Sequence, residues 1–189
     1  MRSRLASTLL ATVLSLGLPA AARSQVGNWL LDGKITVTVS AAGRRVTRSG
    51  HGQALLIINA DRTYSQPGNA LCGGEILSAA EVGTWRPVRR GIVLHPENTA
   101  DLLQQLADCA GAVRLTVRRY RHRVFPLDDG NIRVKTTMSG GGRAYGYGFS
   151  FVAVGRFTGT PTTIDVTSLE VTSRSNLLDA TTGLVRAGP

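Results

Sequence analysis

Apolar and polar residues alternate along much of the chain with a period of two, which is the pattern of half-buried β-strands. Residues 35–39 read Ile-Thr-Val-Thr-Val, and residues 54–58 form the continuous apolar run of a more buried strand. Ser139-Gly140-Gly141-Gly142 is interpreted as a long, mobile hairpin loop between two strands. Further strands are predicted where similar segments are bounded by Gly, Asp, Asn or Pro, at 63–65, 82–88, 92–95, 113–125, 131–138, 144–154 and 163–173.

One segment departs from this pattern and predicts a short helix in the middle of the chain, over about residues 99–109. Its apolar residues Leu102, Leu103 and Leu106 fall on one helical face, and Gly111 can end the helix. The sequence therefore predicts a mostly antiparallel β-protein that contains one short helix.

The N-terminus has the three parts of a secretory signal peptide. Arg2 and Arg4 give it a positive start, residues 5–18 are mainly apolar, and small residues follow. We therefore expect residues 1–24 to be removed and residues 25–189 to form one domain. The mature protein is expected to be exported, either to the periplasm or outside the cell.

Two cysteines, Cys72 and Cys109, remain after the leader. In an exported chain, an even pair of cysteines predicts one disulfide, here between the predicted helix and the loop that follows Cys72. Such a bridge would stabilise the fold by roughly 2–4 kcal/mol.

A short phrase, Val-Gly followed by an aromatic residue two positions after the glycine, occurs at 26–29, 82–85 and 154–157. A glycine at the start of a strand lets the chain bend or lets another backbone approach closely. Three such corners favour a sheet that closes on itself. We therefore predict an all-β, closed or nearly closed up-and-down barrel of about 8–10 strands.

The first copy of the phrase, Gly27-Asn28-Trp29, resembles the G-x-W signature that opens the barrels of lipocalins and the wider calycin group. Gly83-Thr84-Trp85 repeats it. In those barrels the tryptophan closes the base and the interior holds a small apolar ligand. The resemblance thus implies a lipocalin-like barrel, although here the predicted helix lies in the middle of the chain.

The chain is basic, with 22 Lys and Arg against 12 Asp and Glu. Many of the arginines lie in residues 113–125. Strict alternation after Val117 would turn Arg119, Arg121 and Arg123 toward the core, which is very costly. A β-bulge at Arg118-Arg119 removes this conflict. The arginines then form an outer row, while Tyr120, His122 and Val124 continue the inner face.

A three-residue turn at Asp128-Asp129-Gly130 would place Tyr120 opposite Met138 and Arg123 opposite Lys135. Like charges directly opposite each other are mildly destabilising. An anionic partner such as lipid phosphate, polysaccharide or an acidic protein would explain them. The alternative to an anionic partner is that the arginines form a solvated face in an arginine-rich chain. If the bulge is absent, the arginines would instead line the interior. The predicted anion-binding patch consists of Arg121, Arg123, Arg133 and Lys135.

Motifs for catalysis are missing from the sequence. The three histidines have no metal-ligand spacing, and neither a GxSxG nor an SxxK motif occurs. We therefore expect no enzyme activity, no metal and no cofactor. Nucleic acid is not an expected partner, because no recognised binding module is present. The chain is not expected to span a membrane, since no segment after the leader is long and apolar enough for a helix, and few aromatics are available for the girdles of a transmembrane barrel.

The leading hypothesis is a non-enzymatic, secreted or periplasmic protein that holds a small apolar or amphipathic ligand inside a barrel. Candidate ligand-binding residues are Trp29, Trp85, Tyr120 and Met138. The alternative is an envelope-associated or inhibitor-type module that binds a protein, or an anionic polysaccharide or lipid, through its cationic outer face. An apolar cavity would favour the first hypothesis, and a filled core with an exposed arginine row the second.

Overall fold

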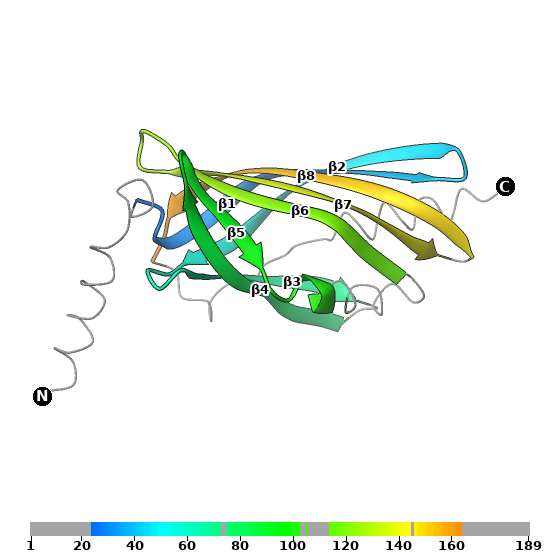
Figure 1. Ribbon diagram of the computed structural model, residues 1–189, viewed down its shortest axis with the longest axis horizontal. Coiled ribbons are helices and arrows are strands. Elements are labelled where there is room, and N and C mark those ends of the chain that lie inside the picture. The colour runs from blue at the N-terminus through cyan, green and yellow to red at the C-terminus, as the bar shows by residue number, and fades with distance from the viewer. Residues whose placement is uncertain (1–23, 73–74, 103–104, 106–113, 145, 164–189) are drawn as a thin grey trace, which may run out of the picture.

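The computed structural model describes residues 24–72, 75–102, 105, 114–144 and 146–163. These residues form eight antiparallel strands that close into a barrel in the order of the sequence (Figure 1), which confirms the predicted all-β up-and-down architecture. The strands are β1 (Gly27–Ala41), β2 (Arg44–Ile58), β3 (Thr63–Cys72), β4 (Glu75–Val88), β5 (Gly91–Pro96), β6 (Arg114–Pro126), β7 (Ile132–Ala144) and β8 (Tyr147–Pro161).

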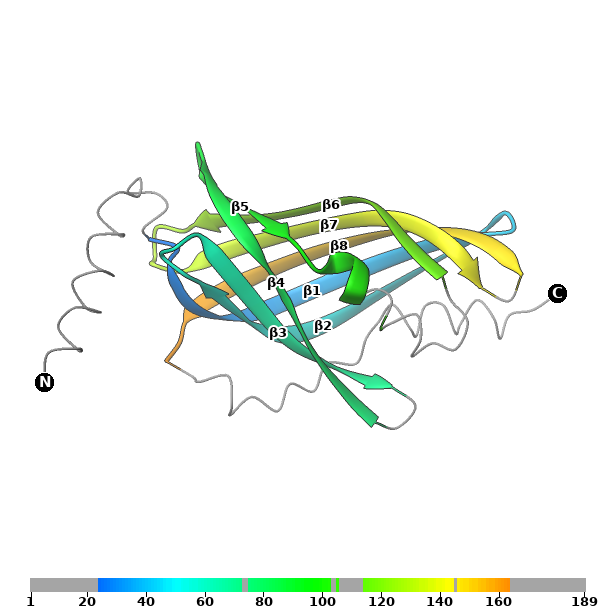
Figure 2. The ribbon, with the colours of Figure 1, turned by 60° about the horizontal axis from the view of Figure 1, so that its bottom comes forward.

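The barrel consists of a closed end and a longer curved sheet. Strand β1 pairs with both β2 and β8 along nearly its whole length, and β7 pairs in the same way with β8. By contrast, β2 pairs with β3 only at Ile57↔Ser65 and Ile58↔Tyr64, and β5 pairs with β6 only near Val93. Strands β6, β7, β8, β1 and β2 therefore continue together past the closed end as what we call the long wall. The β3–β4 hairpin diverges from them (Figure 2).

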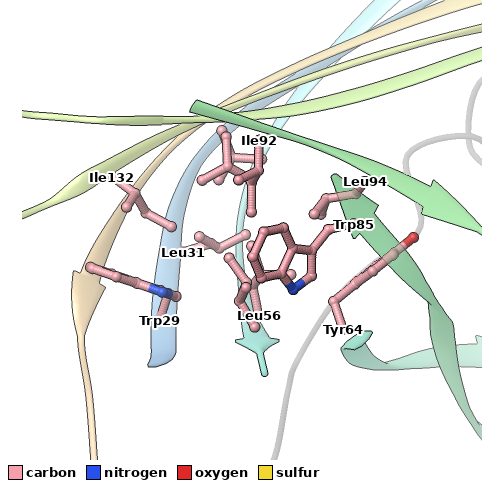
Figure 3. Packing of buried hydrophobic residues seen from close by; sticks show 11 residues of the cluster. Trp29, Leu31, Leu56, Tyr64, Trp85, Ile92, Leu94 and Ile132 are labelled. Atoms are coloured by element: carbon pink, nitrogen blue, oxygen red, sulfur yellow. The ribbon is translucent and has the colours of Figure 1, made fainter. Parts of the chain in front are cut away.

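The closed end is filled by side chains. The indole N–H of Trp29 donates to the carbonyl of Gln25, and that of Trp85 donates to the carbonyl of Asn59, both at 2.9 Å. Both rings are nearly inaccessible to solvent, with exposures of 4% and 2%. Figure 3 shows how tightly this cluster packs. Its buried members are Trp29, Leu31, Leu56, Ile58, Tyr64, Trp85, Ile92, Leu94, Val124, Ile132 and Val134.

The predicted bulge in β6 is confirmed. The β6–β7 register shifts between Val117 and Arg119, so that Arg118 is the extra residue. Beyond it, Tyr120 lies opposite Met138 and Arg123 opposite Lys135, as the turn predicted. The turn itself places Gly130 in the left-handed region, with φ of 80°.

The prediction of a mobile loop at Ser139–Gly142 is wrong, because these residues lie inside β7 and pair with β6 and β8. Glycine is required here by packing. A Cβ on Gly140 would meet the ring of Phe151 at 2.9 Å, and it would also meet the backbone oxygen of Thr116. The run that looked like a loop therefore lets a phenylalanine lie over the strand opposite it.

Only one of the three copies of the Val-Gly-x-aromatic phrase lies at the start of a strand, as predicted. Gly27 begins β1 and has φ of 146°. Gly83 and Gly155 lie inside β4 and β8, so the expectation of three strand starts is wrong for these two copies. Close approach explains both, because a Cβ on Gly83 would strike the backbone of His95, and one on Gly155 would meet the ring of Phe157 at 2.8 Å.

Helical residues begin at Thr99, shortly after β5 ends, and are described up to Leu102 and again at Gln105. No helix among the described residues is long and apolar enough to cross a membrane. Several predictions lie wholly or partly outside the described residues, among them the signal peptide, the second half of the helix, the Cys72–Cys109 disulfide and a strand at 163–173.

Candidate functional site

A group of polar side chains lies on the inner face of the barrel where β3, β4 and β6 meet; we call it the inner polar cluster. The hydroxyl of Tyr64 donates to Oε1 of Glu81 at 2.9 Å, and the hydroxyl of Tyr120 donates to Oε2 at 2.7 Å. One carboxylate therefore accepts two phenol hydrogen bonds, one from a tyrosine of β3 and one from a tyrosine of β6. Tyr64 stands at the edge of the packed core with its hydroxyl directed away from it (Figure 3).

His122 completes the cluster. Its Nδ1 lies 3.3 Å from the hydroxyl of Tyr120 and 3.7 Å from Oε1 of Glu81. Because the Tyr120 proton is already donated to Glu81, the phenol oxygen can only accept from Nδ1, and this network assigns the proton to Nδ1. In the neutral ring Nε2 of His122 is then an acceptor, and among the described residues this buried atom has no hydrogen-bond partner. An unpaired buried acceptor is costly unless something else supplies the donor.

Glu81 is the acidic group of the cluster. Burial raises the pKa of Glu81, but the contacts from His122 and the two phenols outweigh it and hold this pKa below the usual value. Burial, reinforced by the charge of Glu81, raises the pKa of both Tyr64 and Tyr120. Near neutral pH the cluster is therefore one carboxylate held by two neutral phenols.

Strand geometry explains why these residues meet. On β4, Glu81 and Trp85 share the inner face because they are four residues apart. Strand β5 ends at Pro96, opposite Gly83, so no residue of β5 separates Glu81 from β6. The sequence interpretation placed Tyr120 and His122 on the inner face but missed Glu81 and Tyr64. The alternation that turns Trp85 inward was the signal that could have revealed Glu81.

The inner face of the long wall continues from this cluster as an apolar surface. Val37, Val39, Phe151 and Ala153 are buried there. Apolar neighbours that remain partly exposed are Ile35, Leu115, Val117, Met138 and Phe149. The inner face thus changes from a packed core at the closed end to an apolar surface that solvent still reaches.

Of the four residues predicted to bind a ligand, two lie where the inner polar cluster meets the apolar inner face of the long wall. Tyr120 belongs to the inner polar cluster, and Met138 lies directly opposite it on β7. Trp29 and Trp85 instead lie within the packed core of the closed end.

The outer face of the long wall carries a row of basic side chains at directly opposed positions; we call it the outer basic row. All its members are exposed. Two predicted residues, Arg121 and Arg133, lie on the same face, one step to either side of the row. From β6 to β2 the row is Arg123, Lys135, Arg156, Lys34 and His51.

Sequence interpretation found Arg123 and Lys135 but missed Arg156, Lys34 and His51. Arg156 and Lys34 meet across the β1–β8 seam that closes the barrel. A hollow of about 620 Å³ lies along this part of the wall. Its basic lining residues are Lys34, His51, Arg133, Lys135 and Arg156.

One carboxylate also lines the hollow. Oδ1 of Asp32 lies 3.1 Å from Nε2 of His51, and its Oδ2 accepts a hydrogen bond from Gln53 at 3.1 Å. A second hollow, of about 580 Å³, lies near the bulge and the β1–β2 turn. Its basic lining residues are Arg44, Arg45, Arg118 and Arg143.

The described residues contain no group of three His, Cys, Asp or Glu side chains arranged to hold a metal ion. The fold defines the class: a closed eight-stranded antiparallel barrel, an architecture compatible with lipocalin-like proteins. Comparisons with protein-family models, curated proteins and solved structures give no match. The likeness to lipocalins therefore remains one of architecture and of the G-x-W phrase.

Proposed function

We propose that this protein is a non-enzymatic binding protein that holds a small amphipathic molecule on the inner face of its barrel. The ligand would lie between the inner polar cluster and the long wall. The observation that carries this proposal is the unpartnered Nε2 of His122, buried next to an apolar inner face that solvent still reaches. Binding sites of this kind combine an apolar lining with a few polar groups that fix orientation.

The cluster favours a particular kind of head group. The neutral ring of His122 needs a donor at Nε2, and Glu81 beside it is negatively charged. A hydroxyl or an ammonium group supplies the donor, whereas a carboxylate would be repelled by Glu81. Arg119, Arg121 and Arg123 of β6 are on the outer face and do not offset this repulsion. We therefore expect a long-chain alcohol or amine to bind better than a fatty acid.

The first experiment is to express the chain with its own leader, purify the mature protein natively and identify by mass spectrometry what an organic solvent extracts. Recovery of an apolar molecule with a hydroxyl or amine in near-stoichiometric amount is the expected result. The same experiment tests export, because the proposal places the mature protein in the periplasm or outside the cell after removal of residues 1–24.

A matched pair of variants locates the site. Val117→Trp fills the inner face of β6, whereas Val152→Trp adds the same bulk to an outer position that is 46% exposed. The uncharged dye Nile red serves as the probe. Val117→Trp should weaken Nile red binding at least about tenfold, while Val152→Trp should leave it unchanged. Equal binding by the two variants, or no binding by the wild type, would rule out an inner apolar site.

Head-group preference is tested by competition against Nile red with dodecanol, dodecylamine and dodecanoate. Dodecanol and dodecylamine should displace the dye at concentrations at least about tenfold lower than dodecanoate. In His122→Phe, which keeps a flat ring but lacks Nε2, the advantage of dodecanol should disappear. A preference for dodecanoate in the wild type would show that the cluster does not select the head group.

A further inference from the structure

The outer basic row is an unfavourable arrangement unless something binds to it. Arg123, Lys135 and Arg156 occupy directly opposed positions on neighbouring strands, and so do Arg156, Lys34 and His51. Like charges in such positions repel each other. The one carboxylate lining the adjoining hollow, Asp32, already contacts His51 and Gln53. Within the part of the chain that the structure describes, the arrangement thus lacks an anionic counterpart that could balance most of its charge.

The row crosses the strands instead of running along one of them. Neighbouring strands lie about 4.8 Å apart, so its five positions span roughly 19 Å. A basic side chain recurs at every strand along this line. Such an array matches a ligand that carries anionic groups at regular intervals along an extended chain.

We propose that the outer basic row and the adjoining hollow bind a linear acidic polysaccharide. Its carboxylate or sulfate groups lie across β6, β7, β8, β1 and β2, next to the basic side chains of the row. Arginine pairs with such groups in a bidentate way, and lysine acts as a point charge. The hollow of about 620 Å³ between Lys34, Lys135 and Arg156 receives part of a sugar unit.

The surroundings of the row favour a sugar polymer over a lipid surface. Thr36 and Ser49 stand one step along the strands from Lys34 and His51, and their hydroxyls lie 2.9 Å apart. Hydroxyl side chains can hydrogen-bond to sugars, but they do not anchor a protein in a bilayer. The row also follows the convex outside of a closed barrel, so a flat membrane would touch only part of it, whereas a flexible chain can follow it.

Nucleic acid is the competing polyanion. Proteins that hold single strands use aromatic platforms on which bases stack. The row itself contains no Phe, Tyr or Trp. Phe157, which lines the hollow, packs against the core of the closed end. Its ring lies so close to Gly33 and Gly155 that a Cβ at either glycine would meet it at 2.8 Å. The outer basic row therefore offers charge without an aromatic residue on which a base could stack, which favours the polysaccharide.

The test compares two triple variants of the mature chain that remove the same charge. The first is Lys34→Gln with Lys135→Gln and Arg156→Gln, in the row. The control is Arg45→Gln with Arg89→Gln and Arg90→Gln, at exposed positions in or next to the turns that follow β1 and β4. Binding to fluorescent oligogalacturonates and to sulfated dextran is measured by anisotropy at low and at physiological salt.

The row variant should bind both polysaccharides at least about tenfold more weakly than the wild type, and the control variant within about twofold. Wild-type affinity should increase with oligogalacturonate length and level off once the chain spans the row. Equal losses in the two variants would show that net charge alone drives binding and would overturn the proposal. So would tighter binding at equal salt to duplex DNA, to single-stranded DNA or to vesicles rich in phosphatidylglycerol. Nile red binding should be unchanged in the row variant, which separates this site from the inner one.

Discussion

Replacing Glu81 by Gln tests the inner polar cluster most directly, because Gln keeps the shape of Glu, removes its charge and replaces one of its two accepting oxygens by an NH2 donor. Hydrogen bonds to a charged group contribute about 1.5–3 kcal/mol, against about 0.5–1.5 kcal/mol for neutral pairs. Glu81 accepts two such bonds, from Tyr64 and Tyr120, and part of their value is offset by the cost of burying the carboxylate. We therefore expect Glu81→Gln to lower the free energy of unfolding by about 1–3 kcal/mol at pH 7.

The pH dependence makes this prediction specific to ionisation. The folded-state pKa of Glu81 is depressed, so its contribution is present above the unfolded pKa and is lost as pH falls through the folded value. The stability difference between wild type and Glu81→Gln should thus be constant from about pH 6 to 9 and shrink below about pH 4. The raised pKa of Tyr64 affects stability at alkaline pH. The neutral phenol stabilises the folded state, and this stabilisation is lost only as pH rises above about 10.

The assay is urea unfolding at several pH values, followed by the fluorescence of Trp29 and Trp85, which are both buried in the folded state. Asp128→Asn is the control, since it makes the same change at an exposed turn position, and it should shift stability by less than about 0.5 kcal/mol. A Glu81→Gln variant as stable as the wild type at pH 7, or a difference that persists unchanged at pH 3, would show that the carboxylate of Glu81 does not stabilise the inner polar cluster.

Two further predictions concern the backbone of the barrel, and both are measured by urea unfolding. Gly33→Ala should cost about 1–3 kcal/mol, because its Cβ would strike the backbone of β8, whereas Ala at the paired Gly52 meets nothing within 4 Å and should cost little. Deleting Arg118 removes only the bulge and should cost less than about 1.5 kcal/mol, while deleting Arg121 turns an arginine inward and should cost more than about 3 kcal/mol. Equal losses for Gly33→Ala and Gly52→Ala would contradict the β1–β8 register, and equal losses for the two deletions would contradict the bulge in the β6–β7 register.

Local pattern and turn chemistry were enough to predict much of the fold. Alternation gave the strands, and the left-handed Gly130 set the β6–β7 register as far as Tyr120 opposite Met138. The glycine run at 139–142 was misread because glycine is typical of loops. Only the position of the Phe151 ring, contributed by another strand, shows why the strand needs glycine there.

The candidate sites were predictable only in part, because each depends on pairings between distant segments. The register between β1 and β8 joins residues about 120 positions apart and is fixed by barrel closure, for which no local turn gives a signal. Arg156 and Lys34 could therefore not be assigned to one row in advance. Glu81 was hidden for a similar reason, since it reaches Tyr120 only because β5 ends short of it.

Strand β6 shows why the bulge matters to both proposed sites. Tyr120 and His122 face inward while Arg121 and Arg123 face outward, so a shift of one residue would exchange the two sets. If the same residues formed a regular strand without the bulge, one that kept Val117 on the inner face would have to bury arginines and expose the phenol that holds Glu81. The bulge at Arg118 lets Val117 and Tyr120 both face inward. One irregular residue thus allows the same strand to contribute to an inner polar cluster and an outer basic row.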